Sequence, residues 1–118
     1  MKEHREYIRL DRSLKVSYKV VDAAGDKEIS FTEDISGGGL RLSLKRRVQP
    51  GAFLEVEIYL PEITKPIVVT GEVRWLDNKD DAEYPFVVGV KFAEIDQLDR
   101  GKLLKYIRER REEEITEN

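Results

Sequence analysis

The sequence predicts a mainly β protein, an antiparallel sandwich or small barrel of six short strands followed by one helix. Six stretches alternate apolar and polar residues, which is the pattern of strands with one buried face. Turn residues separate these stretches, and apolar residues at helical spacing come after the sixth. With 118 residues, the chain has the length of one ordinary domain.

The six predicted strands fill the central part of the chain. We expect them at residues 14–20, 29–35, 40–45, 54–60, 67–75 and 86–92. In two of them the apolar residues share one parity, and therefore one expected face. These residues are Ile29, Phe31 and Ile35 in the second strand, and Ile67, Val69, Val73 and Trp75 in the fifth.

The ends of the chain differ from its centre. Residues 1–12 are mostly charged without a clear period, so we expect a flexible arm. Asp96 is a suitable helix cap, and the leucines that follow predict a helix over about residues 96–111. We therefore expect one domain over residues 13–112 and a frayed tail over residues 113–118.

Composition excludes several classes of protein. The chain has no cysteine, which rules out disulfides, thiolate zinc sites and cysteine catalysis and favours a cytoplasmic location. Its start does not resemble a secretory signal, and no apolar run is long enough for a membrane-spanning helix. His4 is the only histidine, so we expect no metal site, no histidine-based catalysis and no cofactor. Nothing in the sequence supports an enzyme.

The charge distribution suggests a local anion site. A net charge of −3 disfavours a general nucleic-acid binder. The first twenty residues nevertheless carry six basic side chains against three acidic ones. The last ten residues, 109–118, carry five acidic side chains against two basic ones. Two solvated ends of opposite sign would explain this distribution equally well.

A glycine turn between the second and third predicted strands is the main candidate site. It reads Asp34-Ile35-Ser36-Gly37-Gly38-Gly39. It is neither a Walker loop nor a dinucleotide-binding fingerprint, because a strand follows it in place of a helix. Taken alone, it fits a hairpin turn in which Asp34 and Ser36 make local hydrogen bonds.

Two arginines in the arm extend this interpretation. Arg5 and Arg9 are four residues apart, and each guanidinium can bind a phosphate or the O6/N7 edge of guanine through paired hydrogen bonds. Asp34 complements the N–H donors of guanine, Ser36 adds a hydroxyl, and Gly39 lets the backbone approach. These residue types suit a guanine-containing phosphate ligand, provided that the two segments meet in space. Otherwise, they are two solvated arginines and a separate turn.

The pair of motifs resembles the signature of a known family. Arg5-x-x-x-Arg9 followed by Asp34-x-Ser36-x-x-Gly39 is similar to the two-part motif of the PilZ domain, the bacterial cyclic di-GMP receptor module. Residues 88–92 (Val-Gly-Val-Lys-Phe) resemble a late strand of that family. The resemblance extends from Arg5 to about Arg108.

The resemblance implies a six-stranded antiparallel split β-barrel with a closing helix, whose arm folds over the ligand. Arg5 and Arg9 would clamp guanine and phosphate. Asp34 and Ser36 would hydrogen-bond guanine, and Gly39 would keep the turn open.

Four further residues are weaker candidates for ligand binding. His4 stands where members often carry another arginine, and Gly37 and Gly38 would shape the turn. Trp75 lies late in a strand, where it either packs or stacks on a purine at the barrel rim.

The expected function is that of a stand-alone cyclic di-GMP receptor that orders its arm on ligand binding. It would signal to a downstream protein in motility, adhesion or exopolysaccharide control. One alternative is a PilZ-fold interaction module that works without nucleotide. Another is a small barrel that binds single-stranded nucleic acid, which the net acidity disfavours.

Overall fold

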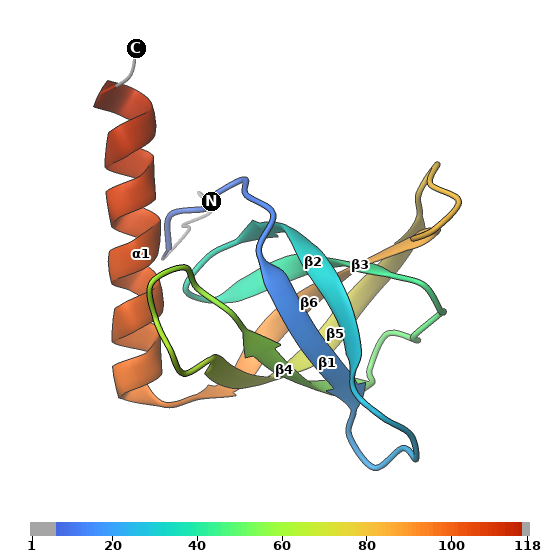
Figure 1. Ribbon diagram of the computed structural model, residues 1–118. Coiled ribbons are helices and arrows are strands. Elements are labelled where there is room, and N and C mark those ends of the chain that lie inside the picture. The colour runs from blue at the N-terminus through green and yellow to red at the C-terminus, as the bar shows by residue number, and fades with distance from the viewer. Residues whose placement is uncertain (1–6, 117–118) are drawn as a thin grey trace, which may run out of the picture.

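The computed structural model describes residues 7–116 and forms a six-stranded barrel with a helix beside it (Figure 1). Its elements are, in chain order, β1 (Lys15–Val20), β2 (Glu28–Ile35), β3 (Gly39–Leu44), β4 (Phe53–Ile58), β5 (Ile67–Asn78), β6 (Phe86–Ile95) and α1 (Gln97–Thr116). All six predicted strands are present, and the fifth and sixth continue three residues beyond their predicted ends.

The strands close into a barrel in the order β1-β2-β3-β6-β5-β4, and all neighbours are antiparallel. The ring is closed by β1 and β4, where Val16 lies opposite Ile58. β3 pairs with β2 on one side and with β6, in place of β4, on the other. The prediction of a six-stranded antiparallel barrel is confirmed, and the sandwich alternative is wrong.

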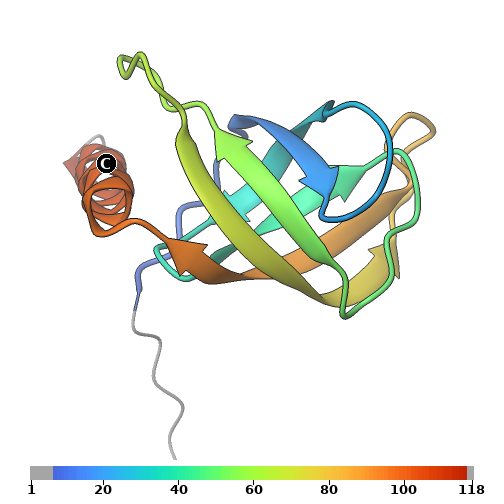
Figure 2. The ribbon, with the colours of Figure 1, turned by 90° about the horizontal axis from the view of Figure 1, so that it is seen from below.

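Apolar side chains from all six strands fill the barrel. Leu42, Leu54 and Val56 are fully buried there. α1 stands beside one end of the barrel (Figures 1 and 2), and its Leu103 and Ile107 join the same core. Along residues 7–116, the structure has no helix that combines the length and the apolar character needed to cross a membrane.

The helix is longer than predicted. It ends at Thr116, so the predicted end near residue 111 is wrong and residues 113–116 of the predicted frayed tail are helical. Residues 117 and 118 of that tail lie outside the described part. Arg110 pairs with Glu113 at 2.6 Å, and Arg12 reaches Glu114 at 3.5 Å. These ion pairs favour helix where the apolar period has ended. At the other end, the predicted cap is confirmed: the Leu98 amide donates to Asp96 Oδ2 at 3.0 Å.

Because of a β-bulge in β2, the residues that share one parity in that strand do not share one face. Thr32 lies opposite Leu42, but Asp34 lies opposite Arg41, so β2 contains one extra residue. Ile29 and Phe31 are therefore exposed (47% and 43%), although Ile35 has the same parity and is fully buried. Shared parity does not give a shared face across a bulge.

A second bulge in β5 has the same effect. Val73 lies opposite Val90 and Trp75 opposite Gly89, which leaves Arg74 as the extra residue. Val73 is fully buried, whereas Trp75 is 41% exposed. Trp75 therefore does not share the face of Val73, although its parity predicted that it would.

The arm is fixed to the barrel by Leu10. This side chain is fully buried, and Leu10 and Ile35 exchange backbone hydrogen bonds of 2.8 and 3.0 Å. Thr32 Oγ1 donates to the Arg12 carbonyl at 2.7 Å. Residues 10–12 are therefore fixed to the barrel, and the predicted flexible arm is left with the part before Leu10. Its flexibility stays a prediction, because residues 1–6 lie outside the described part.

Candidate functional site

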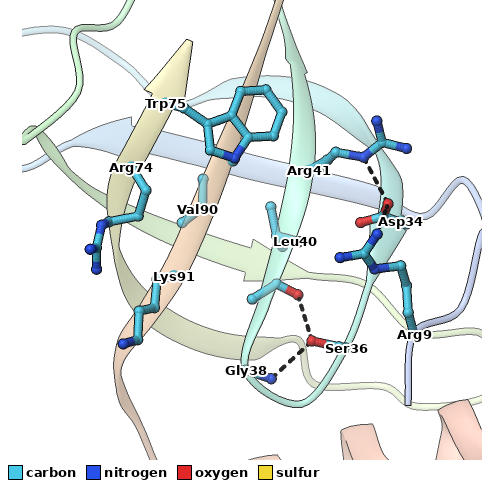
Figure 3. Close-up of a pocket in the computed structure, with 12 residues that line it drawn as sticks. Arg9, Asp34, Ser36, Gly38, Leu40, Arg41, Arg74, Trp75, Val90 and Lys91 are labelled. Atoms are coloured by element: carbon cyan, nitrogen blue, oxygen red, sulfur yellow. Dashed lines mark hydrogen bonds and ion pairs between the residues drawn. The ribbon is translucent and has the colours of Figure 1, made fainter. Parts of the chain in front are cut away.

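A pocket of ≈ 380 Å³ lies on the outer face of the barrel, across β2, β3, β6 and β5 (Figure 3). It is lined by Arg9, Asp34, Ser36, Gly38, Gly39, Leu40, Arg41, Arg74, Trp75, Gly89, Val90 and Lys91. The predicted motif residues Arg9, Asp34, Ser36 and Gly39 are thus brought together, and the two distant segments do meet.

The bulge in β2 directs Asp34 into this pocket. Before the bulge, the even-numbered residues Ser30 and Thr32 are buried, and the extra residue reverses this order. Asp34 therefore lies beside the outward-facing Arg41 instead of entering the apolar core. Bulges commonly redirect side chains next to functional sites.

Two arginines hold the Asp34 carboxylate. Arg41 Nε donates to Asp34 Oδ2 at 2.7 Å, and Arg9 Nη1 lies 3.7 Å from the same oxygen. The carboxylate is only 4% exposed, while the arginine side chains are 42% and 48% exposed. Burial of an acidic group is tolerated here because opposite charges surround it. The sequence analysis missed Arg41, since its place beside Asp34 depends on the register across the bulge.

Ser36 builds the turn between β2 and β3. Its amide donates to the Gly39 carbonyl at 2.8 Å, and its Oγ accepts from the Gly38 amide at 3.1 Å. The local hydrogen bonding expected of a hairpin turn is therefore present inside the candidate site. The Ser36 hydroxyl lies at the edge of the pocket (Figure 3).

The glycines of the turn permit three close approaches. A methyl group at Gly39 would overlap the Val90 carbonyl oxygen on β6. At Gly37 it would overlap the Tyr7 ring and Leu104 of α1, while Gly38 lies against the other side of the same ring. Gly37 and Gly38 thus let the arm and the helix reach the turn. The need for glycine at position 39 arises from strand packing, and its role toward a ligand stays a prediction.

The opposite edge of the pocket comes from β5 and β6. Arg74 and Lys91 lie there, away from Asp34, and both are exposed (Figure 3). The Trp75 indole lies directly on Gly89, where any side chain would overlap the ring. Trp75 therefore packs on the barrel wall and also lines the pocket.

The pocket is strongly positive. Its lining has four cationic side chains (Arg9, Arg41, Arg74 and Lys91) and one carboxylate (Asp34), a sum of +3 in a chain of net charge −3. This local positive charge attracts anions even though the net charge of the whole protein is negative. Among residues 7–116, no cluster of three or more possible metal-ligating side chains occurs.

Two predicted ligand-binding residues cannot be placed. Arg5 and His4 lie outside the described residues, so their roles stay predictions. Arg5 precedes Arg9 by four residues, and Arg9 itself is at the pocket.

Known proteins resemble the chain in sequence and in fold. A model of the PilZ domain family matches residues 3–109. The structure of the Bacillus subtilis inhibitor of motility (MotI/DgrA) has 27% identity and a TM-score of 0.80, with 93% of this chain and 52% of that chain covered. None of the curated proteins compared with the chain matches it.

Two Escherichia coli structures share the fold. The PilZ domain of YcgR with c-di-GMP has 12% identity and a TM-score of 0.70, covering 98% of this chain and 100% of that chain. YcgR in complex with c-di-GMP has 16% identity and a TM-score of 0.72, covering 98% and 49%. The chain thus spans about half the length of this YcgR and of the Bacillus protein. Because the family match covers almost all of the sequence, the chain belongs to the PilZ domain family.

Proposed function

We propose that the chain is a cyclic di-GMP receptor that binds its ligand in the pocket between the arm and the barrel. The observation that supports this most directly is the convergence of Arg9, Asp34, Ser36 and Gly39 in one net-positive cavity. Relatives of the same fold have been solved with c-di-GMP. A ligand with two phosphates and two guanines matches both the charge and the donor groups of the pocket.

Asp34 would select guanine. The Watson–Crick edge of guanine presents N–H donors, which a carboxylate accepts. Both arginine contacts of Asp34 go to Oδ2, and no hydrogen bond from residues 7–116 reaches Oδ1. Guanine would bond to Oδ1 while Arg41 keeps the carboxylate in place.

Arg9 would bind phosphate or the guanine O6/N7 edge, and Arg5 would join it. A hydrogen bond between charged groups contributes about 1.5–3 kcal/mol, so two or three can offset the ordering of a short segment. The arm before Leu10 would then close over the pocket. The closed arm would create or hide a surface that a downstream protein recognises, in control of motility, adhesion or exopolysaccharide export.

Selectivity between two cyclic dinucleotides tests this proposal. At a ligand concentration about 100 times Kd, binding stabilises the folded state by about 2.7 kcal/mol, which raises Tm by roughly 10 °C. We expect this shift with cyclic di-GMP and little shift with cyclic di-AMP, because adenine lacks the N1–H donor that Asp34 would accept. Equal shifts would contradict the role of Asp34. The absence of any shift would favour a nucleotide-independent interaction module.

A further inference from the structure

The two strands that close the barrel, β1 and β4, carry charges of opposite sign on their outer sides. The charged residues of β1 are Lys15 and Lys19, and those of β4 are Glu55 and Glu57. We call the outward side of these two strands the seam face. In the closed ring it lies opposite β3 and β6, which contribute to the pocket (Figure 1). The seam face is therefore a different surface from the proposed ligand site.

The charges of the seam face are only partly paired within one chain. Glu57 accepts a hydrogen bond from Ser17 Oγ at 3.1 Å and pairs with Lys27 at 2.8 Å. Lys19 and Glu55 are direct partners in the strand register, yet neither forms an ion pair within residues 7–116. One cation and one carboxylate on adjacent strands are thus available to another molecule.

Exposed apolar side chains surround these two charges. Val21 and Phe53 lie at one end of the seam, where the Val21 amide donates to the Phe53 carbonyl at 2.9 Å. Ile29 on β2 and Val68 on β5 flank the seam on its two sides, because the register places them in one row that crosses β2, β1, β4 and β5. All four side chains are exposed. Apolar groups that gather on one surface among polar residues are typical of sites that contact other proteins.

The pattern of the seam face is self-complementary. A two-fold axis along the seam, parallel to its strands, would place β1 of each copy on β4 of the other. Lys19 would then meet Glu55 of the second copy, and symmetry would make this contact twice. The flanking Ile29 would meet Val68 of the second copy in the same way. With two lysines on one strand and two glutamates on the other, the two strands carry no net charge, which favours a copy of this chain over a strongly acidic or basic partner.

We propose that the seam face is an interface between two copies of this chain. A closed barrel has no free strand edge, so two barrels associate through the side chains of their outer faces. The dimer would leave the pocket of each copy open, because the seam lies on the far side of the barrel. This inference needs no ligand and goes beyond the proposed function, so either can fail without the other.

Sedimentation velocity of charge-reversal variants, without ligand, tests this inference. We expect the parent to form dimers in a concentration-dependent manner. Lys19→Glu brings two carboxylates together at both symmetric contacts, and Glu55→Lys brings two cations together. Each variant should therefore dimerise at least about tenfold more weakly than the parent. Lys102→Glu makes the same change of charge on the exposed side of α1, away from the seam, and should dimerise like the parent.

An equimolar mixture of Lys19→Glu and Glu55→Lys tests the two-fold pairing itself. In the mixed dimer each carboxylate of one copy again faces a cation of the other, so the mixture should regain the dimer. The melting temperatures of the single variants should stay close to that of the parent, since neither side chain forms an ion pair within its own chain. A parent that stays monomeric up to about 1 mM would overturn the inference. So would single variants that dimerise like the parent, a mixture that stays monomeric, or an equal loss in Lys102→Glu.

Discussion

At the scale of single residues, the two-part motif predicted which residues would lie together, but not what each of them contacts. The sequence was sufficient to predict that Arg9, Asp34 and Ser36 would belong to one site, and they line one pocket. The sequence did not show that Arg41 belongs to this pocket. The 2.7 Å contact of Arg41 with Asp34 depends on the bulge in β2, which the local sequence pattern does not predict. Gly39 shows the same limit, since its close neighbour is on a strand about fifty residues later.

Gly39 offers a prediction about stability that needs no ligand. Gly39→Ala places a methyl group against the Val90 carbonyl oxygen, so the free energy of unfolding should fall by about 1–3 kcal/mol. The matched control is Gly101→Ala in α1, where nothing lies within 4 Å of the new methyl group. That change should raise the free energy of unfolding by about 0.5–1 kcal/mol, because alanine favours helix. Urea unfolding measures both, and equal effects of the two variants would refute the packing argument.

At the scale of elements, alternation predicted where the strands lie but not which way their residues face. All six strands were found from their period, yet Phe31 and Trp75 face outward where parity placed them inward. The cause is one extra residue in each strand. Both bulges flank the pocket. For this reason, alternation could not predict which side chains of β2 and β5 point into it.

The extra residue of β2 is fixed by a polar network between elements. Glu33 Oε2 lies 2.5 Å from Lys79 Nζ and accepts from Ser43 Oγ at 2.8 Å. The hydrogen bond from Lys79, followed by that from Ser43, lowers the pKa of Glu33 below its ordinary value. The network ties β2 and β3 to the turn after β5, and it holds the bulge that directs Asp34.

This network predicts a dependence of stability on pH. A carboxyl group whose pKa is lowered by folding stabilises the fold fully above its unfolded pKa, about 4.3. The contribution is lost as pH falls through the lower folded pKa. Glu33→Gln should therefore be less stable than the parent near neutral pH, by under about 1 kcal/mol because the pair is partly exposed. The gap should close as pH falls through the lowered pKa of Glu33.

Urea unfolding at several pH values measures this effect. Glu94→Gln is the control, because Glu94 is exposed on β6 and forms no ion pair within residues 7–116. A gap for Glu33→Gln that does not change with pH, or that Glu94→Gln reproduces, would show that the network does not stabilise the bulge.

At the scale of the whole molecule, the number of strands and the closing helix were predictable, and two boundaries were not. The helix continues to Thr116 through charged residues that carry no apolar period. The arm is fixed earlier than its charge suggested, because Leu10 is buried against the barrel. A single apolar residue in a charged segment does not reveal the contact that it makes.

The molecule thus presents a fixed barrel face and an arm that the buried Leu10 attaches to it. Arg9 directly precedes this attachment and lies 3.7 Å from the Asp34 carboxylate. Tyr7 lies between the glycine turn and Arg100 of α1, whose guanidinium carbon is 5.6 Å from the ring centre. A ligand that binds Arg9 would therefore act on a segment in contact with both the barrel and the helix.

The central claim is that Arg9 and the glycine turn together bind cyclic di-GMP, and calorimetric titration of the parent and of Arg9→Ala tests it most directly. The account predicts saturable binding by the parent and at least about tenfold weaker binding by Arg9→Ala, with the melting temperature of the free protein nearly unchanged. No heat of binding with the parent, or equal affinity of the two proteins, would contradict it.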